Sequence, residues 1–252
     1  MSDWNDNNRQ SFGQRQTGFG SVPRAGDAVA RGETFDAGLR SHMLKIYNYM
    51  TSGILLTGIV SLLTAQSGLV YTLMSGPLFW LVALAPLGFV FAMSFGANKF
   101  SQGALQVMFW GFAIAMGLSL SSIFVVYTGE SIAATFFATA GAFAGLSLFG
   151  YTTKKDLSGF GTFLIMGVVG LIIASILNIF LGSSTLSLAI SFLGVLIFAG
   201  LTAYDTQRLK REYQHLRGTE FAGKAVILGA LSLYLDFINM FMFLLRFMGS
   251  RE

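Results

Sequence analysis

The sequence predicts an all-α polytopic membrane protein with seven transmembrane helices, and two observations on its charged residues support this fold class. Of the 252 residues, 54% are hydrophobic and only 11% are charged, whereas soluble globular proteins carry about 25% charged residues. No charge occurs between Lys45 and Lys99, between Lys99 and Glu130, between Glu130 and Lys154, or between Asp156 and Asp205. Uncharged stretches of this length do not fit a water-exposed surface, so the chain must cross a membrane several times.

Residues 1–40 precede the apolar part and are polar, glycine-rich and of mixed charge. They contain no apolar run of the length that a signal peptide needs, and their composition is typical of disordered segments. We therefore expect a disordered cytoplasmic tail at 1–40 and a seven-helix transmembrane domain at 41–252. The tail is either a solvated segment without a function of its own or a docking segment for a partner.

The apolar segments that follow have the length of membrane-spanning helices. A helix needs about 20 residues to cross a hydrocarbon core of ~30 Å. Segments of this size, separated by loop residues, lie near 46–66, 77–97, 103–127, 131–151, 160–181, 185–207 and 225–247. The lipid bilayer is therefore the first expected partner of the chain.

The charges in the loops predict the orientation of these helices. With the N-terminus inside, the inner loops contain the basic residues Lys99, Lys154, Lys155, Arg208, Lys210, Arg211, Arg217 and Lys224. The outer loops contain only Glu130, apart from Arg246 and Arg251 near the C-terminus. This distribution follows the positive-inside rule, and a count of six helices would break it. We expect a cytoplasmic N-terminus, an outside C-terminus and no nucleic-acid partner, because the basic residues are explained as topology signals.

The residue types that are missing exclude several kinds of chemistry. Cysteine is absent, which rules out disulfides, thiol catalysis and cysteine-bound metals. His42 and His215 are the only histidines, so a histidine-rich metal centre is excluded as well. We expect no cofactor and no enzymatic activity.

The last apolar segment carries a polar stripe. At 100° per residue, Ser232, Asp236 and Asn239 fall on one face of the helix, and its other faces are apolar. An aspartate at the centre of a membrane costs about 2.5 to 3.5 kcal/mol even on insertion scales. The stripe must therefore face the interior of the bundle or a water-filled path, which suits a helix at the centre of the bundle.

The segment GLTAYDTQRLKRE at 200–212 contains a second intramembrane acid, Asp205. This residue is either an interfacial group paired with Arg208 or Lys210, or one half of an intramembrane acid pair with Asp236. Asp236 itself is either a protonated core carboxyl bonded to a neighbour or a functional group. The two acids reach equal depth only if the helix at 185–207 continues past Asp205, with the two cations extending to the interface.

Contact between Asp205 and Asp236 would have a chemical consequence. Two carboxylates that touch in a low dielectric cannot both ionise easily, so they share a proton and titrate as a unit. Such a pair can bias a two-state element and act as a pH switch. When ionised, the pair offers the oxygen ligands that Ca²⁺ prefers, yet with Asn239 it falls short of the usual six to eight. We expect transient rather than tight Ca²⁺ binding by Asp205 and Asp236.

At these stretches the chain resembles the bacterial members of the Bax inhibitor-1 family, also called the transmembrane Bax inhibitor motif family. The matching segments are GLTAYDTQRLK (200–210), LSLYLDFINMFMFLLRF (231–247) and LNIF (177–180), and the resemblance covers about residues 40–250. It implies six helices around a central C-terminal helix and a pH-sensitive passive calcium leak, gated by a proton that Asp205 and Asp236 share. It also implies a basic latch at the end of the second helix, a place that Lys99 takes here instead of the typical arginine.

The resemblance also implies a location and leaves two other functions open. Bacterial members lie in the inner membrane, and some act on a membrane-anchored ATP-dependent protease through their cytoplasmic tail, a role that residues 1–40 could serve here. Two intramembrane aspartates are also typical of intramembrane aspartyl proteases. Those enzymes need Gly-x-Gly-Asp, whereas Leu233, Tyr234 and Leu235 precede Asp236, and this disfavours an enzyme.

Overall fold

The computed structural model describes residues 25–250, with side chains from residue 37 onward. The chain divides into two units, residues 1–38 and 39–252, and both intramembrane aspartates belong to the second. Residues 1–24 of the predicted disordered tail lie outside the described residues. Residues 25–40 are helical, because α1 runs from Ala25 to Gln66. The stretch AGDAVARGETFDAGLR contains four alanines and two arginines, which favour helix, and three glycines, which do not.

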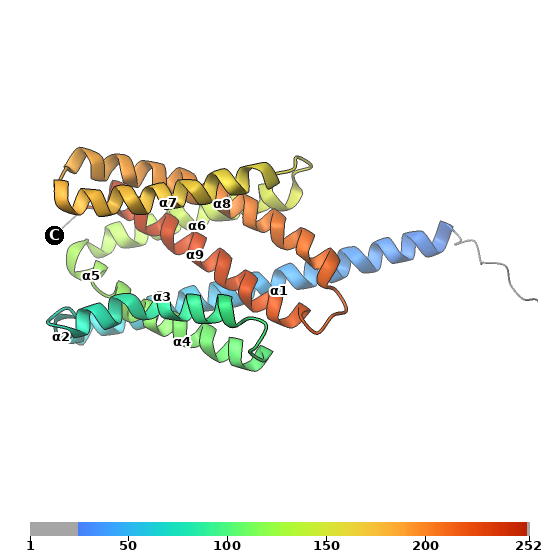
Figure 1. The fold of residues 1–252 in the computed structure, drawn as a ribbon, viewed down its shortest axis with the longest axis horizontal. Helices are drawn as coiled ribbons and strands as arrows, with labels where there is room; N and C mark the ends of the chain where they lie inside the picture. The colour runs from blue at the N-terminus through green and yellow to red at the C-terminus, as the bar shows by residue number, and fades with distance from the viewer. Residues whose placement is uncertain (1–24, 251–252) are drawn as a thin grey trace, which may run out of the picture. The chain divides into compact units, whose positions relative to one another are not determined.

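Helices make up the regular structure of residues 25–250, and no strand occurs among them (Figure 1). After α1 they are α2 (Leu69–Leu73), α3 (Leu78–Gly96), α4 (Gln102–Leu120), α5 (Ile123–Val126), α6 (Gly129–Thr152), α7 (Ser158–Leu181), α8 (Ser184–Leu216) and α9 (Ala222–Met248). Several starts have a polar cap: Ser101, Thr128 and Ser183 accept the backbone N–H three residues on, at 3.2, 3.3 and 3.2 Å. Such caps satisfy donors that the first turn leaves unpaired.

Seven helical stretches are long and apolar enough to cross a membrane, at 37–66, 78–96, 102–126, 129–152, 158–181, 184–216 and 222–248. The prediction of an all-α protein with seven transmembrane helices is confirmed. The third stretch is interrupted between Leu120 and Ile123, where the Ser121 hydroxyl donates to the carbonyl of Leu118 at 2.7 Å. Serine hydroxyls that bond nearby carbonyls compete with the helical ladder. The sixth stretch continues to Leu216, whereas the sequence predicted an end near residue 207. This continuation past Asp205 is the condition under which Asp205 and Asp236 can lie at the same depth in the membrane.

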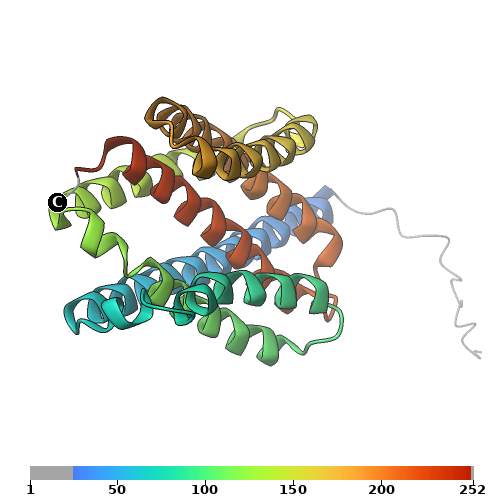
Figure 2. The ribbon, with the colours of Figure 1, turned by 60° about the vertical axis from the view of Figure 1, so that its left-hand side comes forward.

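Helix α9 is the most enclosed of the seven. Of the residues in its apolar stretch 67% are buried, against 11 to 39% in the others. In both views it runs between a group formed by α6, α7 and α8 and a group formed by α1, α3 and α4 (Figures 1 and 2), and it packs against α3, α4, α6 and α8. The Tyr234 hydroxyl adds a link to α1, 2.6 Å from the hydroxyl of Thr57. These contacts join α9 to five of the other six spans, and α7 is not among them. A full ring of six helices around α9 therefore stays a prediction.

Helices α6 and α8 approach each other closely at Gly150. A Cβ at this position would meet the backbone carbonyl of Ala203, so only glycine lets the two backbones come this near. Small residues serve this purpose between helices in lipid. The close approach fixes α8 at the turn that precedes Asp205.

The basic loop residues collect at one end of the helices. The segments 97–101, 153–157 and 217–221 connect α3 to α4, α6 to α7 and α8 to α9 at this end (Figure 1). We refer to it as the basic end. That this end faces the cytoplasm stays a prediction from the sequence.

Candidate functional site

Asp205 is buried on α8 and has partners for both carboxylate oxygens. Its side chain is 7% exposed, and Oδ1 lies 3.2 Å from Nη1 of Arg208, one helical turn further along. The hydroxyl of Ser232, on α9, donates to Oδ2. The (i, i+3) spacing places Asp205 and Arg208 on one face of the helix. The ion pair with Arg208, one of the two interpretations of Asp205, is therefore present, with a buried acid and an arginine side chain that is 36% exposed.

Arg208 connects the acid to the polar end of the helix. Its Nη2 donates to the Ser232 hydroxyl at 3.1 Å, and its Nε lies 3.4 Å from Oε1 of Glu212. The guanidinium also lies over the ring of Tyr204, 5.9 Å from the centroid. The planar, always charged group of an arginine suits this set of contacts. Arg208 is thus part of the site, although the sequence indicated it only as an interfacial partner.

Asp236 lies one turn beyond Ser232 on α9 and is 5% exposed. Its Oδ2 has no hydrogen-bonding partner among the described residues. On the same face, the amide of Asn239 donates to the carbonyl of Leu235 at 2.8 Å and so bonds its own helix. A buried carboxyl oxygen without a partner is costly, and this makes Asp236 the exceptional residue of α9.

A cavity of about 580 Å³ joins these residues. The polar wall of the cavity consists of Asp205 and Arg208 from α8 with Ser232, Asp236 and Asn239 from α9. The facing wall comes from α7 and is mostly apolar, with Leu171, Ile172 and Ile176. The carboxyl of Asp236 lies within electrostatic range of both Asp205 and Arg208. All members of the predicted polar stripe therefore line one cavity with the second acid.

The structure brings the two aspartates to the same cavity, but the described hydrogen bonds between their helices run through Ser232. Asp205 accepts from this hydroxyl, which lies four residues, or ~6 Å of helix, before Asp236. A proton shared directly by the two carboxyls stays a prediction. Lys99, the expected latch, is exposed in the loop between α3 and α4, and the cation that pairs with Asp205 is Arg208. Glu130 is exposed in the first turn of α6.

The residues after Asp205 attach α8 to the loop before α7. The Gln207 side chain accepts from the backbone N–H of Leu157 at 2.9 Å and donates to the carbonyl of Lys155 at 2.8 Å. Lys210 donates to the carbonyl of Tyr151 at 2.8 Å, and Arg211 pairs with Asp156 at 2.6 Å. The segment 205–211 therefore holds both the acidic site and the basic end in place.

Asp156 is the acid of this attachment that lies outside the membrane-spanning stretches. The hydroxyl and backbone N–H of Ser158 donate to its Oδ1 at 2.7 and 2.9 Å. These bonds, followed by the one from Arg211, lower the pKa of Asp156 to about 2. The carboxylate is thus ionised at every pH at which cells operate, and it does not act as a pH sensor.

The oxygen atoms that the cavity offers are few for a resident metal ion. Among the described residues no three histidine or acidic side chains gather closely enough to hold a metal ion. The cavity offers two carboxylates, an amide and a hydroxyl, whereas Ca²⁺ takes six to eight oxygen ligands. Asp205 and Asp236 could contribute ligands to a cation that keeps part of its water shell.

The fold and the site define a class: a seven-helix membrane protein with two buried aspartates on its last two helices. Within this class, residues 39–252 match the family model described as inhibitor of apoptosis-promoting Bax1. The chain belongs to this family, the Bax inhibitor-1 family.

Three bacterial relatives match most of the chain. The inner membrane protein YbhL of Escherichia coli strain K12 is 47% identical over 220 residues, which cover 86% of this chain and 94% of the relative. An uncharacterized protein of Caulobacter vibrioides is 49% identical over 228 residues, covering 86% and 91%. An uncharacterized protein of Rickettsia prowazekii is 44% identical over 225 residues, covering 89% and 95%. The similarity therefore extends over almost the whole length of each relative.

Proposed function

We propose that this protein is a pH-sensitive passive leak channel for cations, with calcium as the permeant ion, in the bacterial inner membrane. The observation that carries the proposal is the buried Oδ2 of Asp236, which has no hydrogen-bonding partner among the described residues and lies in the same cavity as Asp205 and Arg208. Intramembrane acids that face a cavity mark ion and proton paths by default. The inner-membrane name of the Escherichia coli relative supports the location.

Proton occupancy would set the charge of the polar wall. With both aspartates ionised, two carboxylates and one guanidinium leave a net charge of −1, and one bound proton leaves a net charge of zero. A unit charge 4 Å from a cation changes its energy by about 4 kcal/mol at an effective dielectric constant of 20. A single proton is therefore enough to change the passage of a divalent cation.

Calcium flux into proteoliposomes, measured across pH 5 to 8, tests the proposal. We expect flux that depends on pH for the wild-type protein and flux that is independent of pH for Asp236→Asn. Asp205→Asn tests the pairing, and we expect it to change the pH dependence too. A matched control is Asp156→Asn, which removes an exposed carboxylate with a pKa of about 2 and should leave the profile unchanged.

The outcomes have different consequences. Unchanged pH dependence in Asp236→Asn would show that this carboxyl does not gate the leak, and the proposal would be abandoned. An unchanged response in Asp205→Asn alone would overturn only the paired form of it. Flux that is zero at every pH in the wild type would reject the channel altogether.

A second candidate function is an interaction protein that modulates a membrane-anchored ATP-dependent protease. It is favoured by the division of the chain at residue 38, which makes residues 1–38 a unit of their own; this candidate places that unit in the cytoplasm. Deletion of residues 1–38 should then abolish co-purification with the protease while calcium flux persists. Retained co-purification would remove this candidate. Members of the family are not known as enzymes, and the proposal assigns no catalytic residue.

A further inference from the structure

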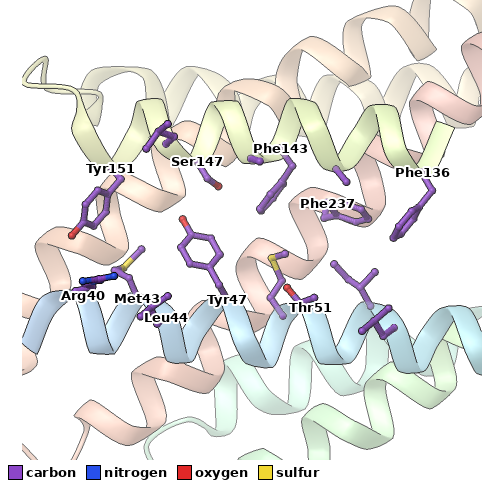
Figure 3. A pocket seen from close by; sticks show the side chains of 16 residues that line it. Arg40, Met43, Leu44, Tyr47, Thr51, Phe136, Phe143, Ser147, Tyr151 and Phe237 are labelled. Carbon is purple, nitrogen blue, oxygen red and sulfur yellow. The ribbon is translucent and has the colours of Figure 1, made fainter. Parts of the chain in front are cut away.

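A second cavity, of about 700 Å³, lies between α1 and α6. Figure 3 shows its two long walls, with Tyr47 and Thr51 on α1 across from Ser147 and Phe143 on α6, and Phe237 of α9 between the two walls. Three leucines among its lining residues, Leu44, Leu55 and Leu148, are 50%, 56% and 63% exposed. The cavity is therefore open to the outer surface of the helices, which in a membrane contacts lipid rather than water.

The two ends of this cavity differ in character. Arg40 and Tyr151 lie at one end, followed by Tyr47 and Ser147, while Phe136 and Phe237 lie at the other (Figure 3). The hydroxyl of Tyr151 points toward α1 on the side of Arg40 (Figure 3). The cavity thus has a polar head and an apolar, aromatic tail.

The polar end carries positive charge that no residue among 37–250 neutralises. Arg40 is exposed, and its guanidinium has no hydrogen-bond or ion-pair partner among residues 37–250. Among the residues whose side chains the structure describes, no acidic residue lines the cavity. The ammonium of Lys210 lies beside this end, because it bonds the backbone carbonyl of Tyr151 at 2.8 Å and lies 5.0 Å from the centre of its ring. An anion at this end would meet two cations and two tyrosine hydroxyls.

The length and position of the cavity match a membrane lipid. Arg40 lies at the basic end of α1, and the step from there to Leu55 is ~22 Å of helix at 1.5 Å per residue. One leaflet contributes ~15 Å of a hydrocarbon core that is ~30 Å thick. A lipid of this leaflet would thus place its head group at Arg40 and have room for its acyl chain along the apolar walls.

We propose that the cavity between α1 and α6 binds one anionic glycerophospholipid from the leaflet at the basic end. Arg40 pairs with the phosphate group, and the hydroxyls of Tyr47 and Tyr151 donate to its oxygens. One acyl chain lies between Thr51 and Phe143 and ends against Phe136 and Phe237. The open side toward the membrane lets the lipid enter laterally, and the site is independent of the cation path proposed above.

Native mass spectrometry of the full-length protein, released from bilayers of equal parts phosphatidylglycerol and phosphatidylethanolamine, tests this proposal. We expect the wild-type protein to retain phosphatidylglycerol in preference. Arg40→Gln should lower this preference about fivefold, the factor that one basic residue near an anionic lipid provides, and Arg40→Lys should keep most of it. The matched control is Lys45→Gln, an exposed cation on the same helix that does not line the cavity.

A second pair of variants tests the cavity rather than the charge. Ala140 lines it, so Ala140→Leu should reduce the bound fraction of both lipids, whereas Ala138→Leu, on the exposed face of α6, should not. Equal retention of the two lipids by the wild type would overturn the proposal, as would equal effects of Arg40→Gln and Lys45→Gln. Unchanged lipid retention in Ala140→Leu would place the lipid elsewhere. An unchanged melting temperature of each variant shows that a loss of lipid does not come from misfolding.

Discussion

The two helices that line the acidic cavity hold their polar side chains in different ways. On α8, Asp205 has an ion pair with Arg208 and a hydrogen bond from Ser232. On α9, Asp236 has an oxygen without a partner among residues 37–250, and there Asn239 bonds only a carbonyl of its own helix. The acid on α8 is therefore fixed by its neighbours, and the acid on α9 is not.

The difference extends beyond the cavity. Residues 207–211 of α8 bond the segment 151–158 through side chains, so a movement of α8 would break several bonds at once. The polar stripe of α9 is linked to α8 mainly by Ser232. We infer that α8 is the fixed side of the site and that changes in proton or ion occupancy act first on α9.

The largest effect is expected from Arg208→Gln, which removes the cation of the fixed side. The guanidinium lies beside Asp205 in the cavity and opposes the entry of other cations. Its loss should raise calcium flux about tenfold, which corresponds to a barrier lower by ~1.4 kcal/mol. This is below the repulsion of about 4 kcal/mol between two unit charges 4 Å apart at an effective dielectric constant of 20. Fluorescence of a calcium indicator inside proteoliposomes measures the flux.

Arg246→Gln provides the control for this variant. Arg246 is an exposed arginine in the last turn of α9, and it contacts the ring of Phe243 at 5.8 Å. Its substitution removes the same charge at the opposite end of the helices and should leave the flux within about twofold of the wild-type value. Equal increases in both variants would mean that net charge, not the position of Arg208, determines the flux.

A matched pair of amides tests the comparison by stability. Gln207→Ala removes two bonds to a different segment of the chain, whereas Asn239→Ala removes one bond within its own helix. At about 1 kcal/mol for each hydrogen bond, Gln207→Ala should destabilise the protein by ~2 kcal/mol and Asn239→Ala by ~1 kcal/mol or less. Melting temperatures in detergent measure both. A lower melting temperature for Asn239→Ala than for Gln207→Ala would reverse the assignment of the fixed side.

The sequence predicted much of this fold because lipid imposes a simple rule on it. Apolar segments of about 20 residues must be helices, and six of the seven expected segments begin within three residues of the observed ones. The exception is α1, which begins at Ala25. Its start was not predicted because its first turns lie in polar sequence, where hydropathy gives no signal.

The site was only partly predictable. The spacing of Ser232, Asp236 and Asn239 placed them on one face, and all three line the cavity. The role of Ser232 as the donor to Asp205 depends on how α8 and α9 are staggered, and helical periodicity within one segment does not determine that stagger. Arg208 could have been found as a site residue from its (i, i+3) spacing alone, once α8 was known to continue past Asp205.

The smallest effect is expected at Asp156, which attaches the loop before α7 to Arg211 on the fixed side. Because the hydrogen bonds from Ser158 and Arg211 lower its pKa to about 2, the ionised group stabilises the fold above its ordinary pKa of about 3.9. This stabilisation is lost as the pH falls through about 2. The melting temperature of the wild-type protein should therefore fall more steeply between pH 4 and 2 than that of Asp156→Asn. Parallel curves would show that the loop attachment contributes nothing to stability, and a difference confined to pH 5 to 8 would contradict the assigned pKa.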